Sequence, residues 1–175
     1  KISQYAMIGS FALGSTFGTF NTANAAAVVI ADGATLTATQ VDEAADTLSN
    51  TASDVTASFN SAASAITFAT LTSAEDSSLT LSFDDLTDAN AETTDITGNI
   101  TAATGSTIAL TVTDGLLDLG GSVVETGTGV VTINVVAAQE LNTTGASKTI
   151  AAAITAAGAT SVLDVDGTAT FSDSV

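Results

Sequence analysis

The sequence predicts an α+β fold in which an apolar N-terminal arm and a long amphipathic helix precede an antiparallel β domain. Three observations support this prediction: an apolar stretch near the start, an apolar stripe with helical spacing, and alternating apolar residues between turn signals in the remainder. The expected segments are the arm over residues 1–33, the helix over residues 34–66 and the β domain over residues 67–175.

The first 25 residues have the layout of a secretory signal peptide. Lys1 is followed by an apolar stretch from Tyr5 to Phe20, and the segment ends in the small-x-small sequence Ala23-Asn24-Ala25. Ser and Thr residues interrupt the apolar stretch, which is also too short for a stable membrane span. If the segment is retained, it is either a buried element of the domain or an arm that another copy buries. Such an arm could pack as a helix in a filament core or add a strand to a neighbouring sheet.

The helix is predicted from spacing. Between Ala34 and Thr97 the chain contains neither glycine nor proline, the two strongest helix breakers. Within this stretch apolar residues recur at alternating intervals of four and three, which is the spacing of one helix face: Val41, Ala45, Leu48, Ala52, Val55, Phe59, Ala62 and Ile66. A helix from about Thr39 to Ala65 would bury this stripe. The intervening Ser, Thr and Asn residues are poor helix formers, so strands remain an alternative here.

The β domain is predicted from alternation. Leu79, Leu81 and Phe83 alternate with polar residues, and residues 108–112 and 131–135 repeat the pattern. Glycine-containing turn signals separate such stretches at intervals of about ten residues, as in sandwiches, jelly rolls and solenoids. The turns show no repeat of constant length, which counts against a regular β-helix. We therefore expect a sandwich or jelly roll, with a β-solenoid as the alternative.

The chain has two resemblances to known families. The stretch ALTVTDGLLDLGGSVVETGTGVVTINV, residues 109–135, resembles passenger regions of bacterial autotransporters, in which Thr and Val alternate between Asp-Gly and Gly-Gly turns. The order of apolar arm, long helix and Thr-rich β domain is similar to that of pilin-like and archaellin-like filament subunits. These resemblances imply a surface location and self-assembly, and they assign no role to any single residue.

The composition excludes most catalytic chemistry. The chain has no His, Cys or Arg, and its two basic residues, Lys1 and Lys148, face 19 acidic residues, giving a formal net charge of −17. Acid–base catalysis near neutral pH usually relies on His, and nucleic-acid binding relies on Lys and Arg. We therefore expect neither an enzyme nor a nucleic-acid-binding protein. Lys148 is expected at the surface. The signal-like start and the composition together favour an extracellular or cell-surface location.

Carboxylates are the remaining candidates for a cofactor, because calcium binds six to eight oxygen ligands. One candidate cluster contains Asp84, Asp85 and Asp88, directly after the predicted strand SLTLSF. A second contains Asp164 and Asp166, whose side chains would point the same way along a strand. The alternatives are a solvated acidic loop for the first cluster and an ordinary strand-to-turn sequence for the second.

The sequence thus favours a secreted structural protein that self-assembles as a homo-oligomer or homopolymer, in a pilus-like filament or a surface layer. The arm and the helix would supply the contacts between subunits. The alternative is a monomeric β-rich adhesin or binding module with a cell-surface ligand, in which residues 1–25 serve as an export signal.

Overall fold

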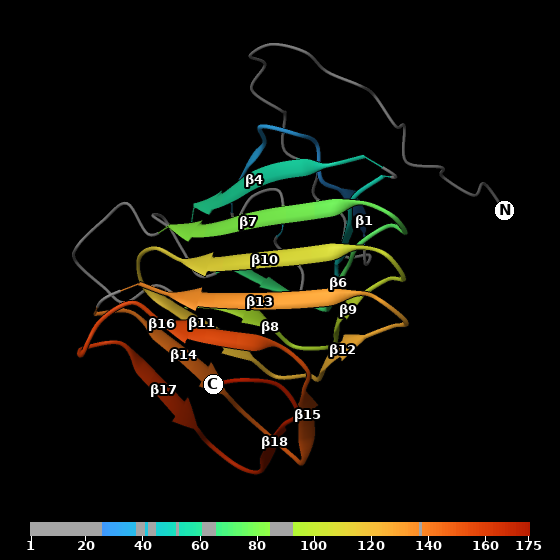
Figure 1. Ribbon diagram of the computed structural model, residues 1–175. Helices are drawn as coiled ribbons and strands as arrows, with labels where there is room; N and C mark the ends of the chain where they lie inside the picture. Colours follow the sequence, from blue (N-terminus) through green and yellow to red (C-terminus); the bar gives the residue numbers. More distant parts are fainter. Residues whose placement is uncertain are drawn as a thin grey trace, which may run out of the picture.

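The chain folds as a β-solenoid. A computed structural model describes residues 26–37, 41, 45–51, 53–60, 66–84, 93–136 and 138–175. These residues contain no helix, and their eighteen strands form three sheets in which every strand pairing is parallel. Successive strands join successive sheets, so the chain winds in stacked coils (Figure 1).

We call the three sheets A, B and C. Sheet A contains β1 (Ala27–Val29), β3 (Thr47–Ser49), β6 (Thr70–Thr72), β9 (Ile100–Ala102), β12 (Val123–Glu125), β15 (Lys148–Ile150) and β18 (Ala169–Phe171). Sheet B contains β2 (Thr35–Thr37), β4 (Val55–Asn60), β7 (Ser78–Asp84), β10 (Thr107–Val112), β13 (Val130–Val135) and β16 (Ala153–Ala156). Sheet C contains β5 (Ile66–Phe68), β8 (Thr93–Ile96), β11 (Leu116–Leu119), β14 (Glu140–Thr143) and β17 (Val162–Val165).

The coils stack in register although their lengths differ. In sheet B, Val55 pairs with Leu79, whereas Ser78 pairs with Thr107, and Thr107 pairs with Val130. The step between paired residues therefore changes from 24 to 29 and then to 23 residues. Inward apolar residues keep the strands aligned because a slip of one residue would turn them toward solvent. The extra residues are placed in the connections, which explains why the sequence lacks a repeat of constant length.

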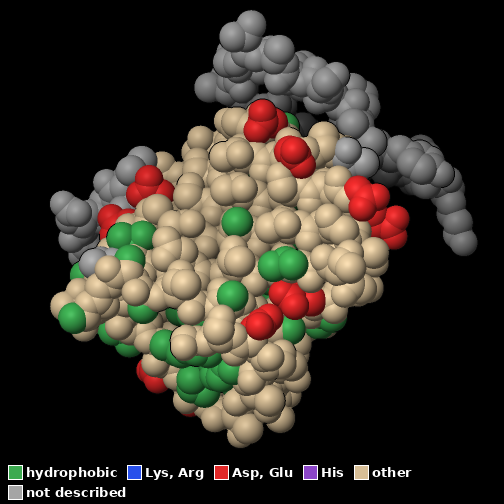
Figure 2. Space-filling model, in the orientation of Figure 1, with side chains coloured by type: hydrophobic (Ala, Val, Ile, Leu, Met, Phe, Trp, Pro, Cys, Tyr) green, Lys and Arg blue, Asp and Glu red, His purple; other side chains and the backbone are tan. Residues whose placement is uncertain are grey.

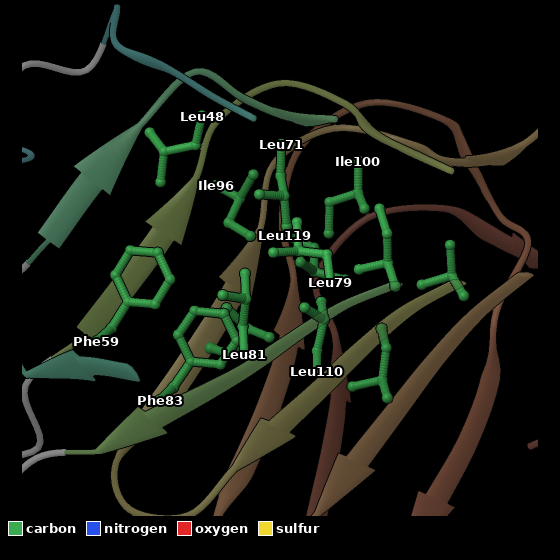
Figure 3. Packing of buried hydrophobic residues seen from close by; sticks show 14 of the residues in the cluster. Leu48, Phe59, Leu71, Leu79, Leu81, Phe83, Ile96, Ile100, Leu110 and Leu119 are labelled. Carbon is green, nitrogen blue, oxygen red and sulfur yellow. The ribbon is translucent and has the colours of Figure 1, made fainter. Parts of the chain in front are cut away.

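One apolar core fills the interior of the solenoid. Inward side chains from all three sheets stack coil upon coil, as Figure 3 shows for Leu79, Leu81 and Leu110 of sheet B and for Ile96 and Leu119 of sheet C. Residues at alternate positions of β7 are buried, and those between them are half-buried or exposed. The alternation predicted for residues 79–83, 108–112 and 131–135 is therefore confirmed as one buried face of β7, β10 and β13.

Three aromatic rings stack inside the second and third coils. Phe59 in β4 lies opposite Phe83 in β7, and their ring centroids are 5.0 Å apart with nearly parallel planes. Phe59 also stacks on Phe68 of sheet C, at a centroid distance of 5.6 Å. All three side chains are at most 2% exposed. Stacked rings at these distances contribute dispersion and quadrupole energy beyond the burial of their area.

The predicted helix over residues 34–66 is wrong. The described parts of this segment form β2, β3, β4 and the start of β5. Leu48, Val55, Phe59 and Ile66 are buried because each occupies an inward position of a short strand, and the strands follow one another around a coil. Their spacing of seven, four and seven residues thus reflects strand and connection lengths. The Ser and Thr residues between them favour strands and turns over a helix.

The predicted antiparallel sandwich or jelly roll is also wrong, and the solenoid alternative is the architecture found. The glycine-rich turns join strands of different sheets and so act as corners of a coil. Of the predicted arm, residues 1–25 lie outside the described residues, and Ala27–Val29 form β1 at the edge of sheet A.

Candidate functional site

The outer face of sheet C carries a ladder of acidic and amide side chains. Asp95, Asp118, Asn142 and Asp164 occupy equivalent positions in β8, β11, β14 and β17, and Thr67 of β5 begins the column. Paired residues on neighbouring parallel strands lie about 4.8 Å apart. This column, the sheet C ladder, therefore places like charges of neighbouring coils close together.

Asp95 is the most perturbed carboxyl of the ladder. Its partial burial raises its pKa, and the neighbouring charge of Asp118 raises it further. The hydroxyl of Thr67 donates a hydrogen bond of 3.3 Å to Asp95 Oδ2, which opposes these effects. On the next coil, Thr144 Oγ1 donates to Asp118 Oδ1 at 2.9 Å. Asn142 Oδ1 is buried and accepts no hydrogen bond from the described residues.

We expect Asp118→Asn to lower the pKa of Asp95 toward its ordinary value, because the variant lacks the neighbouring negative charge. The folded-state pKa of Asp95 lies above its ordinary value of 3.8, so ionisation of Asp95 costs stability. That cost is absent below pH 3.8 and becomes complete as the pH rises through the folded-state pKa. Removing the Asp118 charge lowers the pKa of Asp95 and therefore reduces this cost of ionisation.

Titration of the Asp95 carboxyl by NMR in the wild type and the variant measures this shift. Asp173→Asn, at an exposed residue, removes the same formal charge away from the ladder and serves as the control. An equal fall in the pKa of Asp95 in both variants would show a general effect of net charge and would contradict the assignment.

Lys148 lies at the corner between sheets C and A, and the prediction that it would be at the surface is wrong. It is only 7% exposed, and its Nζ donates hydrogen bonds to the carbonyl oxygens of Leu119 at 2.7 Å, Gly120 at 3.2 Å and Thr144. Burial lowers the pKa of Lys148, and the Asp118 charge partly opposes this. The ammonium group thus ties two successive coils together at this corner.

Lys148→Met is expected to lower the free energy of unfolding by about 2 kcal/mol, because three carbonyl oxygens lose a charged donor while the apolar stem is kept. Thr149→Met changes an exposed neighbour on the same strand and should have little effect. Equal unfolding midpoints in denaturant for Lys148→Met and the wild type would refute the role of the ammonium group.

Of the five residues predicted to bind calcium in two clusters, the structure describes Asp84, Asp164 and Asp166. Asp84 ends β7 on sheet B, opposite Asn60, while Asp85 and Asp88 lie outside the described residues. Asp164 belongs to the sheet C ladder, and Asp166 is exposed in the following turn, where its N–H donates to the Thr143 carbonyl at 3.0 Å. No group of three or more acidic residues suited to holding a metal occurs in the described part of the chain.

The outer face of sheet B carries short, mostly hydroxyl-bearing side chains. Two columns run across its strands in register, and Figure 2 shows this face with few charged or hydrophobic side chains at its centre. The first column contains Thr56, Thr80, Ala109, Thr132 and Ala153. The second contains Thr35, Ser58, Ser82, Thr111, Asn134 and Thr155.

The last described coil has apolar side chains at inward positions that are only partly covered. Leu163 pairs with Leu141 and Val165 with Thr143 of the preceding coil. Leu141 is fully buried, whereas Leu163 and Val165 are 37% and 39% exposed. Hydrophobic side chains gather at the lower end of the molecule in Figure 2, where Figure 1 places β17. Val162 and Val175 are also exposed at this end, and no other part of the described chain exposes as many large hydrophobic side chains.

The sheet C ladder was missed because it depends on pairing across coils. A signal was present: Asp95, Asp118, Asn142 and Asp164 each occupy the third position of a four-residue strand, at intervals of 23, 24 and 22 residues. In each strand the next residue occupies an inward position. This recurring pair of an outward polar residue and an inward residue predicts both the ladder and the parallel fold.

Comparison of the chain with protein-family models, with curated proteins and with solved structures found no match. Among the described residues, no helix is long and apolar enough to cross a membrane.

Proposed function

We propose that this chain is an extracellular structural protein that self-associates and serves as a subunit of a filament or a surface layer. The observation that carries the proposal is the stack of coils, in which parallel strands of three sheets pair in register one after another. Each coil of such a solenoid contacts only its neighbours, which makes the fold an extended scaffold with regular outer faces. A scaffold of this kind suits a structural role in an assembly.

The composition supports a structural role rather than an enzymatic one. Without His, Cys or Arg, the chain has few groups that act as acids, bases or nucleophiles at neutral pH. The stacked sheets make the solenoid stiff, because each inner coil is hydrogen-bonded to the coils on both sides. Calcium bridging by Asp164 or Asp166 stays a prediction for contacts between subunits.

Negative-stain microscopy with light scattering tests this function. The protein is concentrated with calcium, with a chelator and with neither, and filaments, sheets or defined oligomers are the expected result. Loss of the assemblies in chelator would assign the acidic residues to metal-bridged contacts. Particles that keep the 17.1 kDa monomer mass at all concentrations would refute the proposal.

A binding module is the second candidate, and the outer face of sheet B favours it. This face is broad, regular and nearly uncharged at its centre, and among the described residues no other element covers it. Such a module would be a stable monomer that binds cells or extracellular polymers saturably. Substituting the exposed Thr80 by Lys should then reduce binding without changing stability.

A further inference from the structure

The outer face of sheet B presents an array of short side chains that repeats in two directions. We call its two columns, from Thr56 to Ala153 and from Thr35 to Thr155, the hydroxyl array. Neighbouring members of a column lie about 4.8 Å apart, and the two columns lie about 6.6 Å apart along each strand. Figure 1 shows the strands that carry the centre of the array, β4, β7, β10 and β13, aligned side by side.

The fold fixes the positions of these hydroxyl groups. Threonine is branched at Cβ and is stiff about its first side-chain torsion. Within the second column, Ser58 Oγ donates a hydrogen bond to Thr35 Oγ1 at 3.3 Å. Further along the same column, Thr155 Oγ1 donates to Asn134 Oδ1 at 3.1 Å. The array is therefore ordered before it meets a ligand, which reduces the entropy that binding costs.

The chemistry of the array suits a neutral ligand that both donates and accepts hydrogen bonds. Eight of its eleven members carry a hydroxyl group, which donates one hydrogen bond and accepts two. No member is charged, although the chain has a formal net charge of −17. Sheet C differs in this respect, because the carboxylates of its ladder only accept hydrogen bonds when ionised.

The array lacks the groups that other classes of partner need. It contains no Trp, Tyr or Arg, the residues that dominate binding energy in protein interfaces, where Ser and Thr are under-represented. It has no Lys or Arg to contact the phosphates of a nucleic acid. It also has no aromatic ring on which a sugar ring would stack. Small molecules bind in concave pockets, whereas this array lies on the outer face of one sheet.

We infer that the hydroxyl array binds the surface of ice. This inference rests on the binding-module candidate and names its ligand. Water molecules at an ice surface form a lattice in which each one donates and accepts hydrogen bonds, so it matches the array in charge and in chemistry. The repeat of the array makes the same contact available at every coil, and many weak contacts on one rigid surface act together.

Thr80→Lys tests the inference, with Thr149→Lys as its matched control. Thr80 is exposed on β7 within the array, and Thr149 is exposed on the outer face of sheet A. The measurement is thermal hysteresis, the gap between the melting and freezing temperatures of a solution that holds a small ice crystal. The wild type and Thr149→Lys should show the same gap, and Thr80→Lys should reduce it at least twofold. Circular dichroism should show the same β-sheet content in all three proteins.

The outcomes separate the inference from the candidate function on which it rests. Absence of hysteresis in the wild type refutes ice binding, and equal hysteresis in Thr80→Lys and Thr149→Lys refutes the assignment to the array. If the wild type instead binds insoluble cellulose or chitin and Thr80→Lys does not, ice is the wrong ligand while the binding module stands. If the wild type binds neither ice nor these polymers, both the inference and the candidate fail.

Discussion

Phe83→Ala is expected to lower the free energy of unfolding by about 3–5 kcal/mol, the usual cost of truncating a fully buried aromatic side chain. Phe83 is 2% exposed and stacks on Phe59 at a centroid distance of 5.0 Å. Its removal would open a cavity between the second and third coils and would also end the ring contact. Since a domain of this size is stable by only about 5–15 kcal/mol, the variant should unfold at a much lower denaturant concentration.

The matched control is Phe171→Ala, which removes the same side chain from the last coil. Phe171 is only partly buried against the core, so its loss should cost much less. Denaturant unfolding followed by circular dichroism measures both variants. Equal losses for Phe83→Ala and Phe171→Ala would contradict the burial gradient from the interior to the C-terminal end.

Gly121→Ala is expected to destabilise the protein by about 3 kcal/mol for a steric reason. Gly121 lies at the corner between sheets C and A, directly above Gly98 of the preceding coil. A Cβ atom on Gly121 would overlap the Gly98 carbonyl group, and a Cβ on Gly98 would in turn lie 2.5 Å from the Ala69 carbonyl oxygen. Three successive coils therefore approach one another here at backbone distance. Any larger residue must push the coils apart.

Gly33→Ala distinguishes this clash from the general cost of losing a glycine. Gly33 has a φ of +72°, but a Cβ atom there would meet no atom within 4 Å. Its replacement should cost about 1 kcal/mol from backbone strain alone. Thermal or denaturant unfolding should therefore rank Gly121→Ala well below Gly33→Ala in stability. The reverse order would show that the corner can widen and that the close stacking is not essential.

The sequence predicted the long strands of sheet B because they are long enough to show alternation. β7, β10 and β13 have six or seven residues each, with three buried side chains apiece. Strands such as β3 and β6 have three residues and a single buried side chain, so no period can be seen within them. Between residues 34 and 66 the spacing of buried residues in β3, β4 and β5 imitates a helix. β4 was missed despite its six residues because the middle one of its three buried side chains is Ala57, which adds little to an alternating apolar pattern.

Parallel pairing was missed for a related reason. A turn signal between two alternating stretches usually indicates a hairpin, and nothing local distinguishes a hairpin from the corner of a coil. The difference lies in pairing between residues 20 to 29 positions apart, such as Ala27 with Thr47 and Ser78 with Thr107. Variable connection lengths hide this recurrence from a search for a constant period.

The candidate surfaces were only partly foreseen. Asp164 was selected as a possible metal ligand, and it is exposed at the end of the sheet C ladder, but Asp118 and Asn142 were not considered. Lys148 was expected at the surface because isolated lysines usually lie there. Its burial follows from the corner carbonyl oxygens that converge on its ammonium group, which only the assembled coils reveal.

Losing the predicted helix changes how self-assembly is explained. A filament-lining helix over residues 34–66 no longer exists as a contact surface. Self-association, as proposed, must instead use the outer faces of the solenoid that sheets A, B and C form.

Sedimentation equilibrium of the wild-type chain tests the proposed self-association most directly. The measurement covers a wide range of protein concentrations at low and at physiological ionic strength. We predict species larger than the 17.1 kDa monomer, with more of them at the higher ionic strength, because salt screens the repulsion between acidic copies. A single 17.1 kDa species under all conditions would contradict the proposed self-association.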